Sequence, residues 1–396
     1  MNTFYDYLHW RGDLTMEQSS LNEIDSMLFS MLSYVNYTPV LKEFNISDKI
    51  TLLETSKKFE ELGVFENTDK LFDFDKECLE ILKLIAPKKR YSNINLIGYK
   101  EHFKIEKETQ FGAICYILED ESVVVSYRGT DESLIGWKED FAMSFSDKIG
   151  SQKHGLEYLN EVVKINNKPL YLTGHSKGGN VAVYSAIKSS KKIQDRIVKV
   201  YNFDGPGFNS KAVTKEEYLN LSIDKIVTLV PQSSIVGILL QHEEPYSVVF
   251  SSKKTGIFQH YPMTWEVDTS SFIRLDEVDN GTQYFDKTMH TFLDGLSEDD
   301  LTLFINTLFS TLQAGGAITL RDLFKTPGKT LSAIHKYCSE TPTETKKQVE
   351  KIVKAFFKIS GEVAKKESQK QFSENKTKVV NKFKDNFELQ LNELLS

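Results

Sequence analysis

The first ninety residues carry apolar side chains at steps of three and four positions, which is the spacing of an amphipathic helix. We expect one helix near 21–35, with apolar positions at Leu21, Ile24, Met27, Leu28, Met31, Leu32 and Val35. A second helix is expected near 52–63, ending at Gly63, and a third near 77–85, closed by Pro87. Residues 1–90 are therefore predicted to be a helical segment that packs on the rest of the chain.

From about residue 94 the pattern changes to short apolar runs that are typical of buried strands. Residues 112–118 and 122–127 flank a turn of acidic residues and predict a hairpin. Further strands are expected at 169–173, 197–203, 225–230 and 246–250. Because helical stretches separate several of these strands, residues 91–292 predict an α/β core with a mostly parallel central sheet and helices on both faces.

The last hundred residues return to helical spacing. One apolar stripe contains Leu301, Phe304, Ile305, Leu308 and Phe309. Residues 341–396 then hold 12 Lys against 8 Asp and Glu, so this end of the chain is weakly basic. Residues 293–396 predict a C-terminal helical extension. It is either a helical pair packed on the body or a basic amphipathic surface that contacts anionic lipid or a partner helix.

The composition limits the classes of function. At 396 residues the chain is longer than one typical domain, and 40% hydrophobic residues suffice for a buried core. A net charge of −7 argues against nucleic acid as an obligatory partner. The first ten residues lack a basic stretch followed by an apolar one, so we expect no secretory signal. No apolar run reaches the length of a membrane-spanning helix.

The cysteines add a prediction about location. Cys78, Cys115 and Cys338 are few, odd in number and widely spaced, which suits a reducing compartment, the cytoplasm. Their spacing matches no metal-binding pattern, and the sequence predicts neither a metal nor a cofactor. Nothing in the sequence indicates an oligomeric state.

The strongest chemical signal is the pentad from Gly174 to Gly178, of the form Gly-x-Ser-x-Gly. An apolar strand-forming run precedes it and a helix of small residues follows it, which is the context of a nucleophile elbow. We therefore expect Ser176 to be a nucleophile held in a strained turn. The amide of Lys177 would face an oxyanion formed there.

A serine nucleophile needs a base, and the base needs a carboxylate. In hydrolases built on an elbow these groups follow the serine in the order acid, then histidine. Asp204 ends the strand after the elbow helix and is the expected acid, although an aspartate before glycine also serves as an ordinary turn cap. Asp224 precedes its strand and would lie at the wrong edge of the sheet.

Four histidines compete for the role of the base. His260 follows the 246–250 strand and is the expected base, with His290 as the reserve. His242 precedes that strand and is expected to be a polar residue near the mouth of the site. His175 occupies a variable position of the pentad, where the side chain points away from substrate, so its expected role is structural.

The second oxyanion donor should come from the loop after an earlier central strand. Thr130 lies in such a loop and could supply both an amide and a hydroxyl. The stretch from Asp131 to Phe145 carries apolar residues at spacings that suit either a mobile apolar cover or a packed helix.

These residues resemble a known family. Residues 125–130 with Trp137 and Asp140 resemble the oxyanion loop and lid entry of class 3 lipases, and residues 174–179 are similar to their elbow. A bacterial group of lipase-like α/β-hydrolases is more closely similar, on the segments 12–13, 202–207 and 234–237 and on Gln259, His260 and Trp265. The resemblance covers about residues 1–270 and implies an α/β-hydrolase fold.

The resemblance has one departure. Class 3 lipases place their acid one strand later, where this chain has Gln232, Ser233 and Ser234, whereas Asp204 occupies the acid position of pancreatic-type lipases. The resemblance implies a serine hydrolase for small-molecule or lipid esters, acting through an acyl-enzyme. The alternatives are a thioesterase or acyltransferase with the same chemistry, and a non-catalytic protein of hydrolase fold that binds an acyl ligand or a partner.

Overall fold

The computed structural model describes residues 2–314, except residues 70, 105–108, 132–137, 139–142, 144–148 and 255. It also describes residues 347, 358, 359 and 362. The stretch expected to cover the site, 131–145, lies outside the described residues apart from Asp131, Lys138 and Met143. The weakly basic end, 341–396, lies outside them apart from the four isolated residues.

Within the described residues, nine strands form a central sheet in the order β1-β2-β3-β4-β5-β6-β7-β8-β11. Their bounds are β1 (Ile50–Thr51), β2 (Asn95–Lys104), β3 (Thr109–Ile117), β4 (Val123–Tyr127), β5 (Leu170–His175), β6 (Ile197–Phe203), β7 (Ile226–Pro231), β8 (Tyr246–Val249) and β11 (Arg274–Leu275). β9 (Val267–Asp268) and β10 (Ser271–Phe272) form a separate antiparallel pair. The protein is thus a mixed α/β protein with one large sheet.

The prediction of a mostly parallel sheet is correct only for its centre. The four neighbouring pairs from β4 to β8 are parallel. The pairs β1–β2, β2–β3, β3–β4 and β8–β11 are antiparallel. The predicted hairpin of residues 112–118 and 122–127 is confirmed as β3 and β4. β3 pairs antiparallel with β4 and so extends the sheet on one side of its parallel centre.

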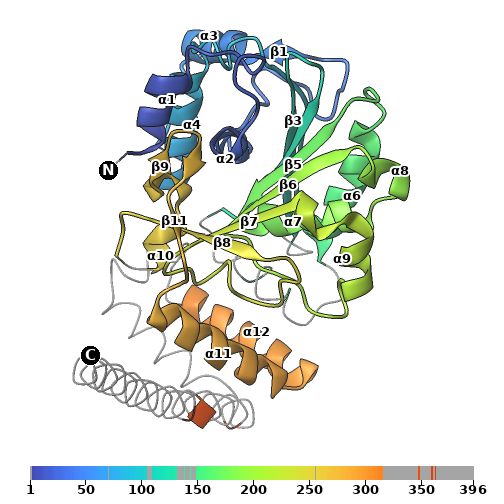
Figure 1. Ribbon diagram of the computed structural model, residues 1–396, viewed down its shortest axis with the longest axis vertical. Helices are drawn as coiled ribbons and strands as arrows, with labels where there is room; N and C mark the ends of the chain where they lie inside the picture. Colours follow the sequence, from blue (N-terminus) through green and yellow to red (C-terminus); the bar gives the residue numbers. More distant parts are fainter. Residues whose placement is uncertain are drawn as a thin grey trace, which may run out of the picture.

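One face of the sheet is covered by the helices that connect the parallel strands. They are α6 (Gly150–Val162), α7 (Lys177–Lys188), α8 (Lys191–Gln194) and α9 (Lys215–Leu221). Since β4 to β8 lie side by side in chain order, right-handed crossovers bring their connections to the same face. Figure 1 shows these helices, coloured green, together on one side of the strands.

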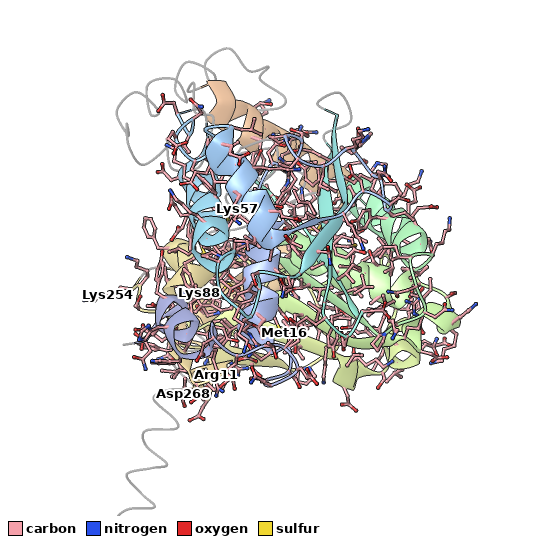
Figure 2. The ribbon with its side chains drawn as sticks, turned by 90° about the horizontal axis from the view of Figure 1, so that it is seen from above. Arg11, Met16, Lys57, Lys88, Lys254 and Asp268 are labelled. Atoms are coloured by element: carbon pink, nitrogen blue, oxygen red, sulfur yellow. The ribbon has the colours of Figure 1, made fainter. Side chains whose placement is uncertain are left out.

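The N-terminal segment covers the other face. Its helices are α1 (Phe4–Arg11), α2 (Glu23–Leu32), α3 (Leu52–Glu61) and α4 (Asp73–Ile85). In β3, Ile114 and Tyr116 pack in the same core as these helices, whereas Ala113 and Cys115 pack in the core of α6 and α7. This alternation is the two-residue period of a strand between two layers. Figure 2 shows the blue helices, beside the labels of Lys57 and Lys88, on the other side of the strands from the green helices.

α2 occupies the centre of this N-terminal layer. Nine of its ten residues are buried, because its residues are mostly apolar or small on every side. Asn22 starts the helix by accepting hydrogen bonds from the amides of Ile24 and Asp25. The carboxylate of Asp25 is held by Arg90, whose Nε lies 2.8 Å from Asp25 Oδ1. This contact joins α2 to the turn that precedes β2.

The C-terminal helices in the described part are α11 (Asn280–Asp294) and α12 (Glu298–Ala314). The apolar stripe from Leu301 to Phe309 is confirmed as part of α12. The helical region begins earlier than expected, because Asp279 accepts a hydrogen bond from Thr282 N and starts α11. The expected boundary between residues 292 and 293 therefore falls inside a helix. Figure 1 shows α11 and α12 below the sheet.

Candidate active site

The predicted strand, turn and helix around Ser176 are present as β5 and α7, which Ser176 alone separates. Ser176 has φ 58° and ψ −133°, a backbone conformation that costs energy for any residue other than glycine. A hydrogen bond of 2.9 Å from Ser176 N to Phe203 O joins the turn to the end of β6. A side chain at Gly174 would come within 2.2 Å of the main chain of Gly178, so the turn requires glycine there.

Asp204 lies beside Ser176 at the carboxyl edge of the sheet. Residues His175 and Phe203 pair across β5 and β6, so Ser176 and Asp204 each follow one member of the same pair. Neighbouring strands are separated by about 4.8 Å, which brings the two residues close together. Asp204 is fully buried, and its φ of 51° turns the chain sharply after β6.

The carboxylate of Asp204 has three hydrogen-bond partners. Oδ2 lies 2.7 Å from Nδ1 of His260. Oδ1 accepts hydrogen bonds from Ser234 Oγ at 2.6 Å and from Gly237 N at 3.1 Å. Ser234 and Gly237 lie in the loop after β7, where the sequence offered no acid. That loop supplies donors to the carboxylate instead, a role that the sequence did not reveal.

His260 follows the short helix α10 (Gly256–Gln259) and is 8% exposed. Because a carboxylate only accepts hydrogen bonds, the imidazole must donate from Nδ1 to Asp204, and the neutral ring then keeps an unprotonated Nε2. An unprotonated Nε2 is the atom with which a histidine takes a proton from a serine. The main chain just before it is fixed by Trp265, whose Nε1 donates to Gln259 O at 2.8 Å.

His175 joins the elbow to His260. Its Nε2 lies 2.7 Å from the main-chain oxygen of His260, and the two imidazole rings lie 4.5 Å apart between centroids. Its Nδ1 lies 3.2 Å from the hydroxyl of Tyr34. Burial, and to a lesser extent the neighbouring His260, hold the pKa of His175 well below its ordinary value. The sequence suggested only a structural role and gave no indication of this contact.

The loop after β4 packs directly against the elbow. A Cβ on Gly129 would lie 2.4 Å from His175 O and 3.2 Å from Ser176 Cβ. A Cβ on Gly178 would lie 2.2 Å from Tyr127 O. Thr130 follows Gly129 in this loop, and Lys177 begins α7 and is buried. The two residues expected to supply oxyanion amides therefore belong to segments in mutual contact.

The other candidate residues lie elsewhere. His290 is on α11, with Nε2 3.1 Å from Asp286 Oδ1. Asp224 is in the 3₁₀ turn η2 (Ile223–Lys225), before β7 and at the opposite end of the sheet. His242 contacts Asp204 only indirectly, through Gly237. Its Nε2 donates to Gly237 O at 2.8 Å, and Gly237 N in turn donates to Asp204 Oδ1.

Two further properties concern the described residues only. No group of three or more His, Cys, Asp or Glu side chains among them could hold a metal ion. Within the same part of the chain, every helix is too short or too polar to cross a membrane.

Comparison with known proteins gives one match. A family model described as Mbeg1-like matches residues 85–310, which is more than half of the 396 residues. The matched region contains the elbow, Asp204, His260 and the loop after β4. The searches of curated proteins and of solved structures found no match.

Proposed function

Because the chain belongs to the Mbeg1-like family, which is lipase-like, we propose that it is a serine hydrolase that cleaves carboxylic esters of lipid or acyl type. The observation that carries the proposal is the pairing of Asp204 with His260 at 2.7 Å beside the strained turn of Ser176. A carboxylate that orients an imidazole next to a serine on a tight turn is the arrangement that activates a serine hydroxyl.

We also propose that the core of the chain has an α/β-hydrolase fold. The parallel strands β4 to β8, with the elbow between β5 and α7, support an α/β-hydrolase fold. We divide the chain into the N-terminal layer, residues 1–90, the hydrolase core and a C-terminal helical extension that begins with α11. Free, buried Cys78 and Cys115 support a reducing location, the cytoplasm.

The proposed reaction proceeds in two steps. In the first, Ser176 Oγ attacks the ester carbonyl while its proton passes to His260 Nε2, and that proton then goes to the departing alcohol. In the second, His260 takes a proton from water, the hydroxide attacks the acyl-enzyme, and the proton returns to Ser176 as the acid leaves. Throughout, Asp204 accepts the Nδ1 hydrogen and stabilises the imidazolium.

In this proposal the amides of Thr130 and Lys177 donate hydrogen bonds to the oxyanion of each tetrahedral intermediate. Backbone amides need no reorganisation when the charge forms. In subtilisin, the loss of one oxyanion donor raises the activation barrier by about 2.7–4 kcal/mol. The contact between the Gly129 loop and the elbow supports this assignment, because both amides then belong to one rigid unit.

The proposal is tested by labelling with a fluorophosphonate probe and by turnover of p-nitrophenyl esters. We expect the wild type to react in both assays and Ser176→Ala to react in neither. The matched control is Ser185→Ala, which removes another buried hydroxyl from the same helix and should leave both assays unchanged.

Three other results would change the assignment. A folded wild type whose Ser176 is not labelled would indicate a binding protein without catalysis. Labelling combined with acyl transfer to an added alcohol in excess of hydrolysis would indicate a transferase. Labelling with preferential cleavage of thioesters would indicate a thioesterase.

A further inference from the structure

A pocket of about 490 Å³ lies between the N-terminal layer and the antiparallel side of the sheet. Part of its wall comes from the loops and helices of the N-terminal layer. The apolar side chains of this wall are Val35, Pro39, Leu62, Val64, Leu71 and Leu79. The volume is within the range of pockets that bind small organic molecules, and an apolar wall of this kind suits an alkyl chain.

Part of the pocket wall comes from the residues on either side of the proposed oxyanion donor Thr130. Arg128 and Asp131 both line the pocket, and between them in the chain are Gly129 and Thr130. Tyr34 also lines it and places its hydroxyl 3.2 Å from His175 Nδ1. Thr130 precedes Asp131 directly, with about 3.8 Å between their Cα atoms, so the proposed oxyanion donor is one residue away from the pocket wall.

Among the described residues that line the pocket, the charged side chains carry more negative than positive charge. Three carboxylates, Asp75, Glu101 and Asp131, line the pocket together with one guanidinium, Arg128. Arg128 Nη1 is already paired with Glu101 Oε1 at 2.7 Å. Although burial opposes ionisation, this guanidinium holds the pKa of Glu101 below its ordinary value. An incoming anion would therefore meet a guanidinium whose charge is already balanced.

We propose that this pocket binds the alkyl chain of an ester whose polar part is neutral or cationic, and that it rejects anionic amphiphiles such as fatty acids and phosphate-bearing lipids. The inference rests on the proposed function in one respect, since the bound molecule is taken to be the ester cleaved at Ser176. Hydrolysis turns the neutral acyl ester into a carboxylate beside a lining with excess negative charge. The repulsion would then favour release of the acid product.

Binding is measured with Ser176→Ala protein, so that no turnover is required. Isothermal titration would compare three amphiphiles that share a dodecyl-length chain, namely the dodecanoyl ester of glycerol, the dodecanoyl ester of choline, and dodecanoate, each below its micelle concentration. We expect both esters to bind and dodecanoate to bind about tenfold more weakly at low ionic strength, with the difference shrinking as salt screens the charges. Equal or tighter binding of dodecanoate would overturn the proposal.

Two matched pairs of variants locate the site. Leu62 is 57% exposed and lines the pocket, so the uncharged variant Leu62→Asn should weaken binding of both esters about tenfold without unfolding the protein. The control is Leu219→Asn on α9, where the leucine is 60% exposed in the opposite layer and its replacement should have no effect. Asp75→Asn should narrow the difference between the choline ester and dodecanoate, whereas Asp73→Asn on the same helix should not.

The two proposals fail in different ways. If the wild type hydrolyses no ester but the Ser176→Ala protein shows the expected order of affinities, the pocket assignment stands and the proposed function falls. If the wild type hydrolyses esters but Leu62→Asn changes neither KM nor the affinity of Ser176→Ala protein, the pocket assignment is wrong and the proposed function stands.

Discussion

The imidazole of His175 donates a hydrogen bond from Nε2 to the main-chain oxygen of His260, at 2.7 Å. A carbonyl oxygen only accepts, so Nε2 of His175 must carry the hydrogen, and in the neutral ring Nδ1 then accepts from the Tyr34 hydroxyl. The residue before the proposed nucleophile thereby holds the backbone of the proposed base, and Tyr34 of the N-terminal layer supports it. His175 is thus a positioning residue.

Replacing His175 tests this role. His175→Phe fills the same space but has no donor, so the loop that carries His260 loses its link to the elbow. We expect kcat for ester hydrolysis to fall about 10- to 100-fold with little change in KM, because small displacements of a catalytic group have effects of this size. His175→Gln keeps a side-chain N–H and should recover part of the rate. Equal kcat values for the two variants would contradict a positioning role.

The same histidine predicts a pH dependence of stability. Its pKa in the folded protein is well below the ordinary value of 6.5. Below pH 6.5 the unfolded chain therefore binds a proton that the folded protein does not. The contribution of His175 to stability is complete above that pH and is lost as the pH falls toward the lowered pKa of the folded protein.

We expect this one group to contribute a slope of about 1.4 kcal/mol per pH unit to the unfolding free energy below pH 6.5. Urea unfolding at a series of pH values measures it. His175→Gln removes the titrating group, so its stability curve should be flatter than that of the wild type in this range. Parallel curves would show that His175 is protonated in the folded protein.

The third prediction concerns the hydrogen bonds that the carboxylate of Asp204 accepts. Ser234→Ala removes the hydroxyl that lies 2.6 Å from Asp204 Oδ1, while the amide of Gly237 remains. We expect kcat to fall about tenfold, the size of one hydrogen bond to a charged group. Asp204→Asn should cost about 10⁴-fold, as the loss of the triad carboxylate does in serine proteases. Ser233→Ala, one residue away, is the matched control and should leave kcat unchanged.

The loop after β4 should tolerate no side chain at Gly129. A Cβ there would come within 2.2 Å of the Tyr34 hydroxyl and 2.4 Å of His175 O, so the loop that carries Thr130 must move. Since Thr130 is a proposed oxyanion donor, Gly129→Ala should lower kcat about a hundredfold. Gly281→Ala, where the nearest atom is Asp279 Oδ1 at 3.3 Å, serves as the control. A Gly129→Ala enzyme with normal kcat would exclude Thr130 as a donor.

The fifth prediction concerns the stability of the N-terminal layer. Asp25 and Arg90 form a fully buried ion pair, and the hydroxyls of Tyr7 and Tyr91 also donate to Asp25 Oδ1. Arg90→Met leaves the carboxylate buried without its cation, which should lower the free energy of unfolding by about 3–5 kcal/mol. Chemical denaturation measures this loss.

The control for Arg90→Met is an exposed ion pair. Lys164 Nζ lies 2.8 Å from Glu161 Oε1 at the surface. Lys164→Met should change the free energy of unfolding by less than about 1 kcal/mol, because solvent screens such pairs. Similar losses for the two variants would indicate that Asp25 becomes protonated or hydrated once Arg90 is gone.

Much of the fold could be predicted because its signals are local. The apolar runs predicted β3 to β8, the glycines around Ser176 predicted the turn between β5 and α7, and chain order selected Asp204 and His260 from the available acids and histidines. Their catalytic roles stay predictions. Periodicity and turn chemistry depend on residues within a few positions of one another, and such relations can be read from one sequence.

Only the tertiary structure decided how distant segments meet. It packed the helices α1 to α4 as a layer on one face of the sheet, placed Tyr34 against His175, and supplied Asp204 with Ser234 and Gly237 as donors. Beyond the predicted β3–β4 hairpin, it also added β1, β2 and β11 to the sheet as antiparallel strands, which the sequence did not predict. These contacts join residues 30 to 141 positions apart, and no local pattern encodes them, because they form only when the two layers close on the sheet.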